Sequence, residues 1–334
     1  MLKEGILSAV GNTPLIGLTR IFKDVSFHLY AKLEGFNPGG SIKDRPALNI
    51  LKSCLETGVI KSDTVIIESS SGNMGIGLAQ ACSYYGLHFI CVVDPKTTQQ
   101  NIRLLEAYGA EVHLVERPDP VTGEYLQARI NHVQGLLRSI NNSYWPNQYA
   151  HIANPAAHHQ TMAEIAIALD NRVDYLFCAA STCGTLRGCS EYVQSHRLET
   201  TIVAVDAVGS VIFGGDKAKR LIPGHGAAVR PELYREELAN QCFYATDLDC
   251  IVGCRRLVRD EAILAGGSSG AVIMAVEQLK QDIPPDANCV VIFPDRGERY
   301  LDTIYSDSWV EKHFGDVSHL WQTAGEKACM AMTY

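Results

Sequence analysis

The chain of 334 residues is 46% hydrophobic and 20% charged, a composition typical of a globular protein long enough for two packed domains. Its 29 basic and 37 acidic residues give a net charge of −8 without a lysine- or arginine-rich run, so we expect no nucleic-acid partner. Eleven scattered cysteines without a CxxC pair predict reduced thiols and no metal site. The sequence lacks an apolar span of ~20 residues and a signal peptide, so we expect a cytoplasmic protein that does not bind membranes.

Strand and helix patterns alternate along the chain. After a turn and a short strand, a strand is expected at 28–33 and a helix from Ile42 to about Gly58. The first half continues with strands expected at 64–68, 88–93, 111–115 and 144–149 and helices at 74–85, 98–108 and 123–141. The second half is expected to contain helices at 155–169, 184–196, 247–260 and 269–281 and strands at 174–179, 201–206 and 289–293. This alternation predicts an α/β protein with two doubly wound sheets whose loops surround one cleft.

A glycine-rich turn leads into the first long helix, with the sequence Asn37-Pro38-Gly39-Gly40-Ser41-Ile42-Lys43-Asp44. Ser41 is predicted to be the N-cap, with Asp44 as the short analogue of a capping-box partner. Lys43 then lies in the first helical turn, where the helix dipole disfavours a cation. We expect a lowered pKa for this amine, as a nucleophilic Schiff-base lysine requires.

Two hydroxyl-rich turns each lie between a strand and a helix, where free backbone N–H groups bind anions. The first, Ser69-Ser70-Ser71-Gly72-Asn73-Met74-Gly75, suits a carboxylate or a phosphate, and the second, Ser181-Thr182-Cys183-Gly184-Thr185, suits a phosphate. The GxxxxGK[ST] motif is absent, and no GxGxxG follows a strand. A phosphate site with a dedicated lysine and neither of these motifs indicates pyridoxal phosphate as the cofactor.

The segment Gly266-Gly267-Ser268-Ser269-Gly270 has two interpretations. It matches GxSxG, the nucleophile elbow of α/β-hydrolases, which would make the protein a serine hydrolase with Ser268 as nucleophile. Its partners would come from Asp295 or Asp302 and from His313 or His319. Alternatively, Ser268 is a helix N-cap whose hydroxyl faces the ring nitrogen of a pyridine cofactor. The cofactor interpretation is favoured because it also explains the lysine turn and both anion sites.

With these four motifs in chain order, the sequence resembles the fold-type II pyridoxal phosphate enzymes, the family of cysteine synthases and cystathionine β-synthases, over about residues 5–312. The resemblance implies a tryptophan synthase β-like fold with the cofactor in the cleft between two domains. It implies that Lys43 holds the cofactor as an imine, that Asn73 bonds its ring oxygen and that Ser268 faces its pyridine nitrogen. The cofactor phosphate would be bound by Ser181, Thr182, Cys183, Gly184 and Thr185. The substrate α-carboxylate would be bound by Ser70, Ser71 and Met74 with the help of Gln148. Gly72 and Tyr149 are further substrate-binding candidates.

Three segments depart from the usual cysteine synthase pattern. Met74 stands where that pattern has Thr, Tyr149 where it has Phe, and Pro294-Asp295-Arg296-Gly297 where it has Pro-Ser-Ser-Gly. In the segments 144–149, 205–214 and 294–297 the chain is similar to the branch that makes N-(2-amino-2-carboxyethyl)-L-glutamate from O-phospho-L-serine and L-glutamate through an aminoacrylate, for 2,3-diaminopropionate in siderophore biosynthesis. The alternative is a sulfur nucleophile, as in cysteine synthase or cystathionine β-synthase. Arg129 is a candidate to bind the donor phosphate, and Arg296 to bind the side-chain carboxylate of glutamate.

The resemblance also implies the domain organisation. A large cofactor-binding domain is expected at 1–40 and 146–312, and a small, mobile domain that closes over the substrate at 41–145. The tail at 313–334 is assigned no role. Members of this family are usually homodimers, so a homodimer acting on small amino-acid substrates is expected.

Overall fold

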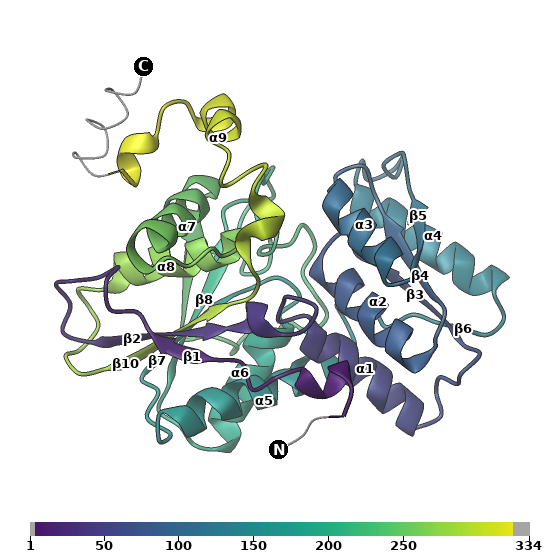
Figure 1. Cartoon of the computed structure of the whole chain (residues 1–334), viewed down its shortest axis with the longest axis horizontal. Helices are drawn as coiled ribbons and strands as arrows, with labels where there is room; N and C mark the ends of the chain where they lie inside the picture. The colour runs from purple at the N-terminus through teal and green to yellow at the C-terminus, as the bar shows by residue number, and fades with distance from the viewer. Residues whose placement is uncertain (1–3, 323–334) are drawn as a thin grey trace.

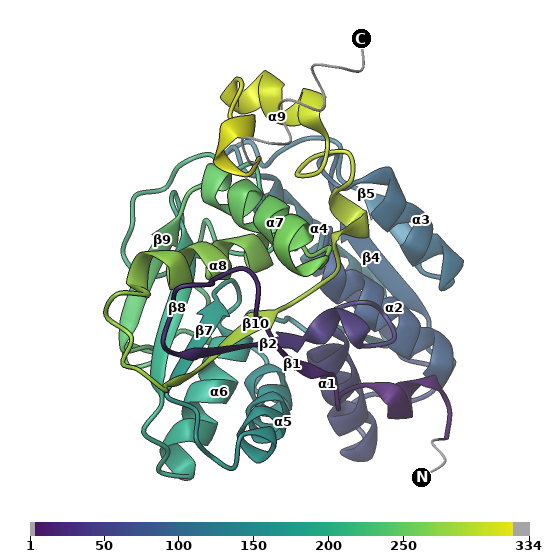
Figure 2. The same cartoon turned by 60° about the vertical axis from the view of Figure 1, so that its left-hand side comes forward.

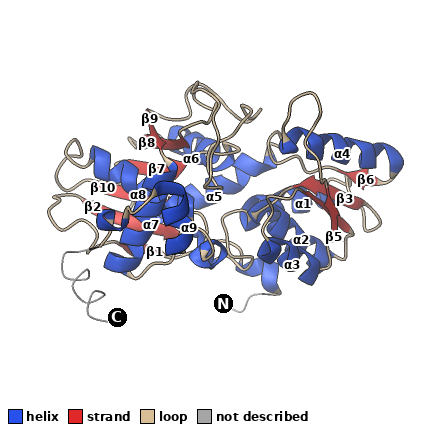
Figure 3. Cartoon of the chain, turned by 90° about the horizontal axis from the view of Figure 1, so that it is seen from above, coloured by secondary structure: helices blue, strands red, loops and turns tan. Residues whose placement is uncertain are grey.

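Two β-sheets lie at opposite ends of the molecule, in a computed structural model that describes residues 4–322 (Figures 1 and 3). The larger sheet has the order β1-β2-β10-β7-β8-β9, in which all neighbours are parallel except β1 and β2. Its strands are β1 (Leu15–Gly17), β2 (His28–Leu33), β7 (Tyr175–Ala179), β8 (Thr201–Ala207), β9 (Gln241–Ala245) and β10 (Asn288–Phe293). We call this sheet and its helices the six-stranded lobe.

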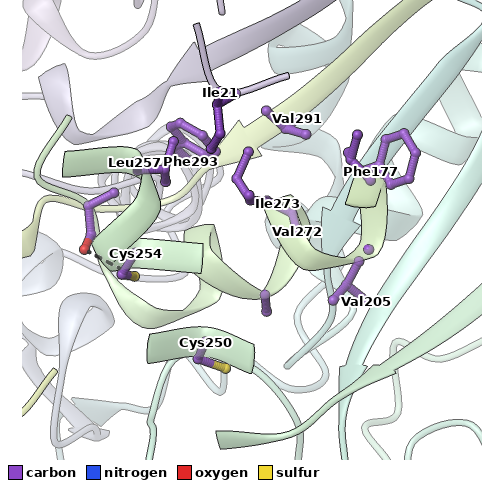
Figure 4. Packing of buried hydrophobic residues seen from close by; sticks show 14 of the residues in the cluster. Ile21, Phe177, Val205, Cys250, Cys254, Leu257, Val272, Ile273, Val291 and Phe293 are labelled. Atoms are coloured by element: carbon purple, nitrogen blue, oxygen red, sulfur yellow. Dashed lines mark hydrogen bonds between the residues drawn. The ribbon is translucent and has the colours of Figure 1, made fainter. Parts of the chain in front are cut away.

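Helices cover both faces of this sheet because successive strand residues point to opposite sides. Val290 and Ile292 of β10 pack in the core beneath α5 (Ala153–Ala168) and α6 (Gly184–Ser195). Val291 and Phe293 pack on the other side, against α7 (Asp247–Glu261) and α8 (Gly267–Leu279), where Figure 4 shows them beside Leu257 and Ile273. Figure 2 shows the two helix layers above and below the sheet.

The smaller sheet is entirely parallel, with the order β5-β4-β3-β6, and we call it and its helices the four-stranded lobe. Its strands are β3 (Val65–Ser69), β4 (Phe89–Val93), β5 (Glu111–Leu114) and β6 (Ser143–Tyr144). One face is covered by α2 (Asn73–Tyr85) and α3 (Gln99–Ala107), and the other by α4 (Tyr125–Ser139). The predicted pair of doubly wound α/β units is therefore confirmed. The two sheets fall on either side of the expected division at residues 40 and 146, although the domain boundaries themselves stay a prediction.

Helix α1 (Asp44–Glu56), which follows the lysine turn, packs against helices of both lobes, α2 and α5. Buried ion pairs fix its first turn. Arg45 makes two bonds to Glu34, at 2.7 and 2.8 Å, and two to Glu164 of α5, at 2.9 and 2.7 Å. Lys32 of β2 also reaches Glu164, at 2.7 Å. Bidentate guanidinium–carboxylate pairs fix geometry as well as charge, so this network sets the position of the residues before Arg45, Lys43 among them.

Several predicted element boundaries are wrong for local reasons. The strand expected at 144–149 ends at Tyr144, because Pro146 has no N–H to donate and Asn147 has a φ of 44°. Helix α1 begins at Asp44, and α8 begins at Gly267, so Ser41 and Ser268 are not N-caps. Sequence periodicity missed the edge strand β9 and the helix α9 (Asp307–Phe314).

The part of the tail that the structure describes packs on the six-stranded lobe. Trp321 is buried in the core that contains α7, and its carbonyl oxygen accepts a hydrogen bond from Arg259 of that helix. The tail from residue 323 onward, which was assigned no role, lies outside the described residues. Within residues 4–322, the helices are all too short or too polar to cross a membrane.

Candidate active site

The loops that follow three parallel strands meet at a cavity of about 130 Å³ between the lobes. Ser70 follows β3, Ser181 follows β7, and Asp295 follows β10. The carboxyl ends of parallel strands are the usual position of ligand sites in open α/β sheets. We call this space the central cavity, and Lys43 lies in its wall.

The lysine turn is attached to the end of β10 by backbone pairing. Ile42 N–H donates to Pro294 O at 2.7 Å, and Ser41 forms a β-bridge with Asp295. The predicted capping box between Ser41 and Asp44 does not form. The carboxylate of Asp44 instead accepts a hydrogen bond from Gly39 N–H at 2.5 Å. The Ser41 hydroxyl accepts from Lys43 N–H at 3.2 Å. These bonds hold Lys43 as the N-cap of α1, one residue before the helix.

Burial is the largest cause of the lowered pKa of Lys43. Cys178 and the carboxylate of Asp295 act in the opposite direction and limit the shift. A lowered amine pKa increases the fraction of neutral amine near neutral pH. The residue can therefore act as a nucleophile and as a base toward a group in the cavity.

The 181–185 loop surrounds the N-terminus of α6. The first backbone N–H groups of a helix lack intrahelical acceptors and attract anions. A side chain at Gly184 would overlap that of Asn154, whose Nδ2 donates to Gln148 O at 2.7 Å. Thr185 Oγ1 lies 3.3 Å from His158 Nε2, and burial lowers the pKa of this imidazole well below its ordinary value. The loop is thus a rigid cup of amides and hydroxyls with no acidic side chain.

Asn73 and Asp295 form a polar pair in the wall of the central cavity. Asn73 Nδ2 donates to Asp295 Oδ2 at 2.7 Å, and Tyr300 OH donates to the same oxygen at 2.7 Å. Oδ1 of Asp295 is buried without a hydrogen-bond partner, and burial raises the pKa of the carboxyl group. The sequence motifs assigned no cofactor or substrate role to Asp295. Asp295 was noted in the sequence only as a departure from the Pro-Ser-Ser-Gly pattern and as a candidate for the hydrolase triad.

Ser268 lines the central cavity from the first turn of α8, opposite Gly224. No histidine within residues 4–322 is hydrogen-bonded to its hydroxyl, and His313 instead bonds Trp309 O of its own helix. The candidates for a hydrolase triad therefore do not come together. A serine at this position can present a neutral hydroxyl to a ligand in the cavity.

The residues expected to bind the substrate carboxylate divide into two groups. Ser70, Met74, Gln148 and Tyr149 all line the central cavity. Ser70 Oγ accepts from Gly75 N–H at 2.9 Å, which fixes the loop at the start of α2. The neighbouring Ser71 and Gly72 are partly exposed and lie outside the cavity lining. Their assigned roles stay predictions, as do those of the first group.

The two arginines expected at the substrate lie outside the central cavity. Arg129 of α4 is buried, its Nε is 3.2 Å from Asp94 Oδ2, and its Nη1 has no hydrogen-bond partner. Arg296 is exposed and forms an ion pair with Glu298. Spacing along the chain places neither arginine, because the direction of a long side chain is set by its partner, which is Asp94 for Arg129 and Glu298 for Arg296.

Pyridoxal phosphate fits the groups that line the central cavity. The amide-and-hydroxyl cup at 181–185 suits the phosphate, and Lys43 supplies the amine for the aldehyde. The orphaned buried atoms Asn154 Oδ1 and Asp295 Oδ1 are polar groups beside this space that a ligand or its bound water would satisfy. Asn73 and Ser268 line the same cavity and can contact the ring.

Solved structures of similar proteins cover most of the chain. A hydrogen sulfide-producing enzyme from Fusobacterium nucleatum is 32% identical, with a TM-score of 0.84 over 90% of this chain and 99% of that one. The O-acetylserine dependent cystathionine β-synthase from Helicobacter pylori is 30% identical, with a TM-score of 0.85 over 92% of this chain and all of the other. O-ureido-L-serine synthase is 26% identical, with a TM-score of 0.85 over 98% and 100%.

Residues 6–295 match the family described as pyridoxal-phosphate dependent enzyme. This match covers the lysine turn, both anion-binding loops and the GxSxG segment. The chain therefore belongs to the pyridoxal-phosphate dependent enzymes, and among them to those that catalyse β-replacement.

Proposed function

We propose that this enzyme replaces the phosphate of O-phospho-L-serine with the amino group of L-glutamate, giving N-(2-amino-2-carboxyethyl)-L-glutamate and phosphate. This product would supply 2,3-diaminopropionate for siderophore biosynthesis. In the reaction, the bond between the β-carbon and oxygen breaks and phosphate leaves with the electron pair. The amine nitrogen forms a bond to the same carbon and releases one proton.

The buried guanidinium of Arg129 carries the proposal for the donor. Two of its nitrogens, Nε and Nη1, lack a well-formed hydrogen bond, although Asp94 is close. Burial raises the pKa of Tyr149, and the charge of Arg129 acts against this shift, so the guanidinium is near a residue of the central cavity. A phosphate leaving group brings more negative charge than an acetate and favours such a cation.

The residues of the central cavity have distinct roles in this proposal. Pyridoxal phosphate, when bound, stabilises negative charge at the α-carbon of the amino acid. Lys43 would bind the cofactor and then take and return the proton at that carbon, which its lowered pKa favours. The 181–185 loop would hold the cofactor phosphate, while Asn73 and Ser268 orient the ring. Ser70, Met74 and Gln148 would hold the substrate carboxylate.

Water must be kept from the activated substrate, because hydrolysis would waste it as pyruvate and ammonia. Helix α2 and the 70–74 loop belong to the four-stranded lobe, while Ser268 and the 181–185 loop belong to the six-stranded lobe. Closing of the four-stranded lobe over the bound donor would bring these groups together and exclude water. This motion is part of the proposal.

Sulfur chemistry is the second candidate, because two of the similar structures are a hydrogen sulfide-producing enzyme and a cystathionine β-synthase. The test supplies O-phosphoserine or O-acetylserine as donor, each with glutamate, sulfide or homocysteine, and identifies products by mass. The proposal is supported if glutamate is converted to N-(2-amino-2-carboxyethyl)-L-glutamate, and if this is clearly faster with O-phosphoserine than with O-acetylserine. Product only with sulfide or homocysteine, or equal rates from both donors, would contradict it.

We further propose that the enzyme works in the cytoplasm as a homodimer. Nine of the ten cysteines among the described residues are buried as free thiols, and the tenth is half-buried. Light scattering during size-exclusion chromatography measures the mass directly. A particle of one chain's mass would contradict the dimer.

A further inference from the structure

A second cavity of about 440 Å³ lies directly beside the central one. It is lined by one side of α4, by Trp145 and Asn147, and by residues 228–232 of the six-stranded lobe. Tyr149 lines both cavities, so the two meet at this residue. A molecule bound in the second cavity would therefore be adjacent to a substrate in the first.

Two cations from the six-stranded lobe line the second cavity. Lys217 Nζ lies 2.6 Å from Glu124 at the N-terminus of α4, and both side chains are partly exposed. An ammonium has three N–H donors, so this pair leaves capacity for a further acceptor. Arg230 donates from Nε to Ile212 O at 3.0 Å, and its guanidinium lies over the Tyr234 ring at 4.8 Å. Its terminal nitrogens carry four more N–H groups, which is the geometry that suits a carboxylate.

Three glutamates, Glu68, Glu124 and Glu232, also line the second cavity, and Glu68 connects it to the central one. Glu68 Oε1 accepts from Trp145 Nε1 at 2.9 Å and from Ser69 N–H at 2.8 Å. Its other oxygen, Oε2, accepts only from Gln148 N–H, at 3.2 Å, and Gln148 lines the central cavity. A carboxylate oxygen can accept two hydrogen bonds, so Oε2 has room for one from an ammonium group.

We propose that the second cavity binds the acceptor substrate, and that it selects an amino acid with two carboxylates through Lys217 and Arg230. This inference rests on the proposed function and assigns its second substrate a place. The ammonium group points toward Glu68 and Tyr149, which directs the amine toward the central cavity. Sulfide would need neither cation. Arg296, the earlier candidate for this contact, lines neither cavity and is paired with Glu298.

The test compares the two halves of the reaction in Lys217→Ala, Arg230→Ala and Arg230→Lys. Lys219→Ala is the matched control, because Lys219 is an exposed lysine two residues away that lies outside the cavity lining. The first half is phosphate release from O-phosphoserine in a single turnover without acceptor. The second is kcat/KM for glutamate at saturating donor, repeated with glutamine. Melting temperatures check that each variant is folded.

We expect kcat/KM for glutamate to fall at least tenfold in both alanine variants, while phosphate release stays within twofold of wild type. Arg230→Lys should recover part of the loss, and the control should match wild type. The preference for glutamate over glutamine should fall in the variant whose cation binds the side-chain carboxylate.

The inference is wrong if both alanine variants keep wild-type efficiency with glutamate, or if phosphate release falls by the same factor. An unchanged preference for glutamate over glutamine in both variants also contradicts it. Failure of the proposed function is seen separately, in wild type alone. If wild type forms product only with sulfide, the proposed function and the dicarboxylate site are both wrong.

Discussion

The central cavity and the second cavity share Tyr149, yet they are built from different kinds of groups. The central cavity is formed by residues at strand ends and helix starts, held by backbone bonds such as Ile42 N–H to Pro294 O. The second is bordered by long charged side chains, among them Lys217 and Arg230, on a loop without regular structure. Rigid groups suit the placement of a cofactor, and longer side chains suit the choice of a substrate.

In our proposal, this difference means that the central cavity determines catalysis and that the second cavity determines the choice of acceptor. Changes in the central cavity should affect every reaction that the protein catalyses, whichever acceptor is supplied. Changes in the second cavity should affect one acceptor more than another. The first three of the following predictions test the central cavity, the fourth concerns Glu68 of the second cavity, and the acceptor-site variants test the choice of acceptor.

The largest effect is expected from Lys43→Ala. Without the amine, the cofactor loses its covalent attachment and the α-proton loses its base, so turnover should fall about 10²–10⁴-fold with every acceptor. The absorbance of the protein-bound imine should also disappear. Lys52→Ala, at an exposed position on the same helix, is the control and should behave as wild type. Retention of the imine absorbance in Lys43→Ala would show that another lysine binds the cofactor.

Gly184→Ala should weaken cofactor binding more than it weakens the fold. The added methyl group would overlap Asn154, so the 181–185 loop has to shift away from its cup geometry. We expect the dissociation constant for pyridoxal phosphate to rise about 10–100-fold, which corresponds to about 1.4–2.8 kcal/mol. Gly135→Ala in α4 is the control, because nothing lies within 4 Å of its added carbon. Equal affinity in both variants would contradict the phosphate-cup assignment.

Asp295→Asn should change the pH dependence of turnover more than it changes the maximal rate. The negative charge of Asp295 raises the pKa of Lys43 against the lowering effect of burial, so its removal should lower that pKa further. The acid limb of the rate profile should move to lower pH, with maximal turnover reduced about tenfold or less. Asp24→Asn, at an exposed position, serves as the control. An acid limb that moves upward, or does not move, is incompatible with this role.

The smallest effect is expected in stability, from the titration of Glu68, which lines the second cavity. Burial raises the pKa of Glu68 from 4.5 to about 7, so the folded state binds a proton that the unfolded state has released. The contribution of this proton binding to the free energy of unfolding is fully present below pH 4.5 and is lost as the pH rises through 7. The melting temperature of Glu68→Gln relative to wild type should therefore increase between pH 5 and pH 8. A constant difference over this range would contradict the raised pKa.

The sequence was sufficient for most strands and helices and for the loops at strand ends, but not for β9 and α9. Apolar strands followed by glycine- and serine-rich helix starts are local patterns, and they placed Lys43, Asn73, Ser181 and Ser268 around one cleft. The parallel sheets followed from the same alternation. In these places, local preference and tertiary structure agree.

The remaining features depend on contacts between residues far apart in sequence. Asp295 enters the central cavity because β10 ends beside the lysine turn, which no spacing along the chain reveals. Arg129 pairs with Asp94 of the strand β4–helix α3 connection, whereas Arg296 pairs with Glu298, only two residues away. The second cavity depends on residues 217 and 228–232, which have neither strand nor helix periodicity.

The bridge between Ser41 and Asp295 also bears on how the enzyme is made. Lys43 is translated early, but the backbone that holds it in place is supplied by residues about 250 positions later. A nascent chain on the ribosome therefore carries the reactive amine long before that amine has its pocket. Capture of the vitamin-derived cofactor should follow release of the completed polypeptide, and chains truncated before residue 288 should not take it up.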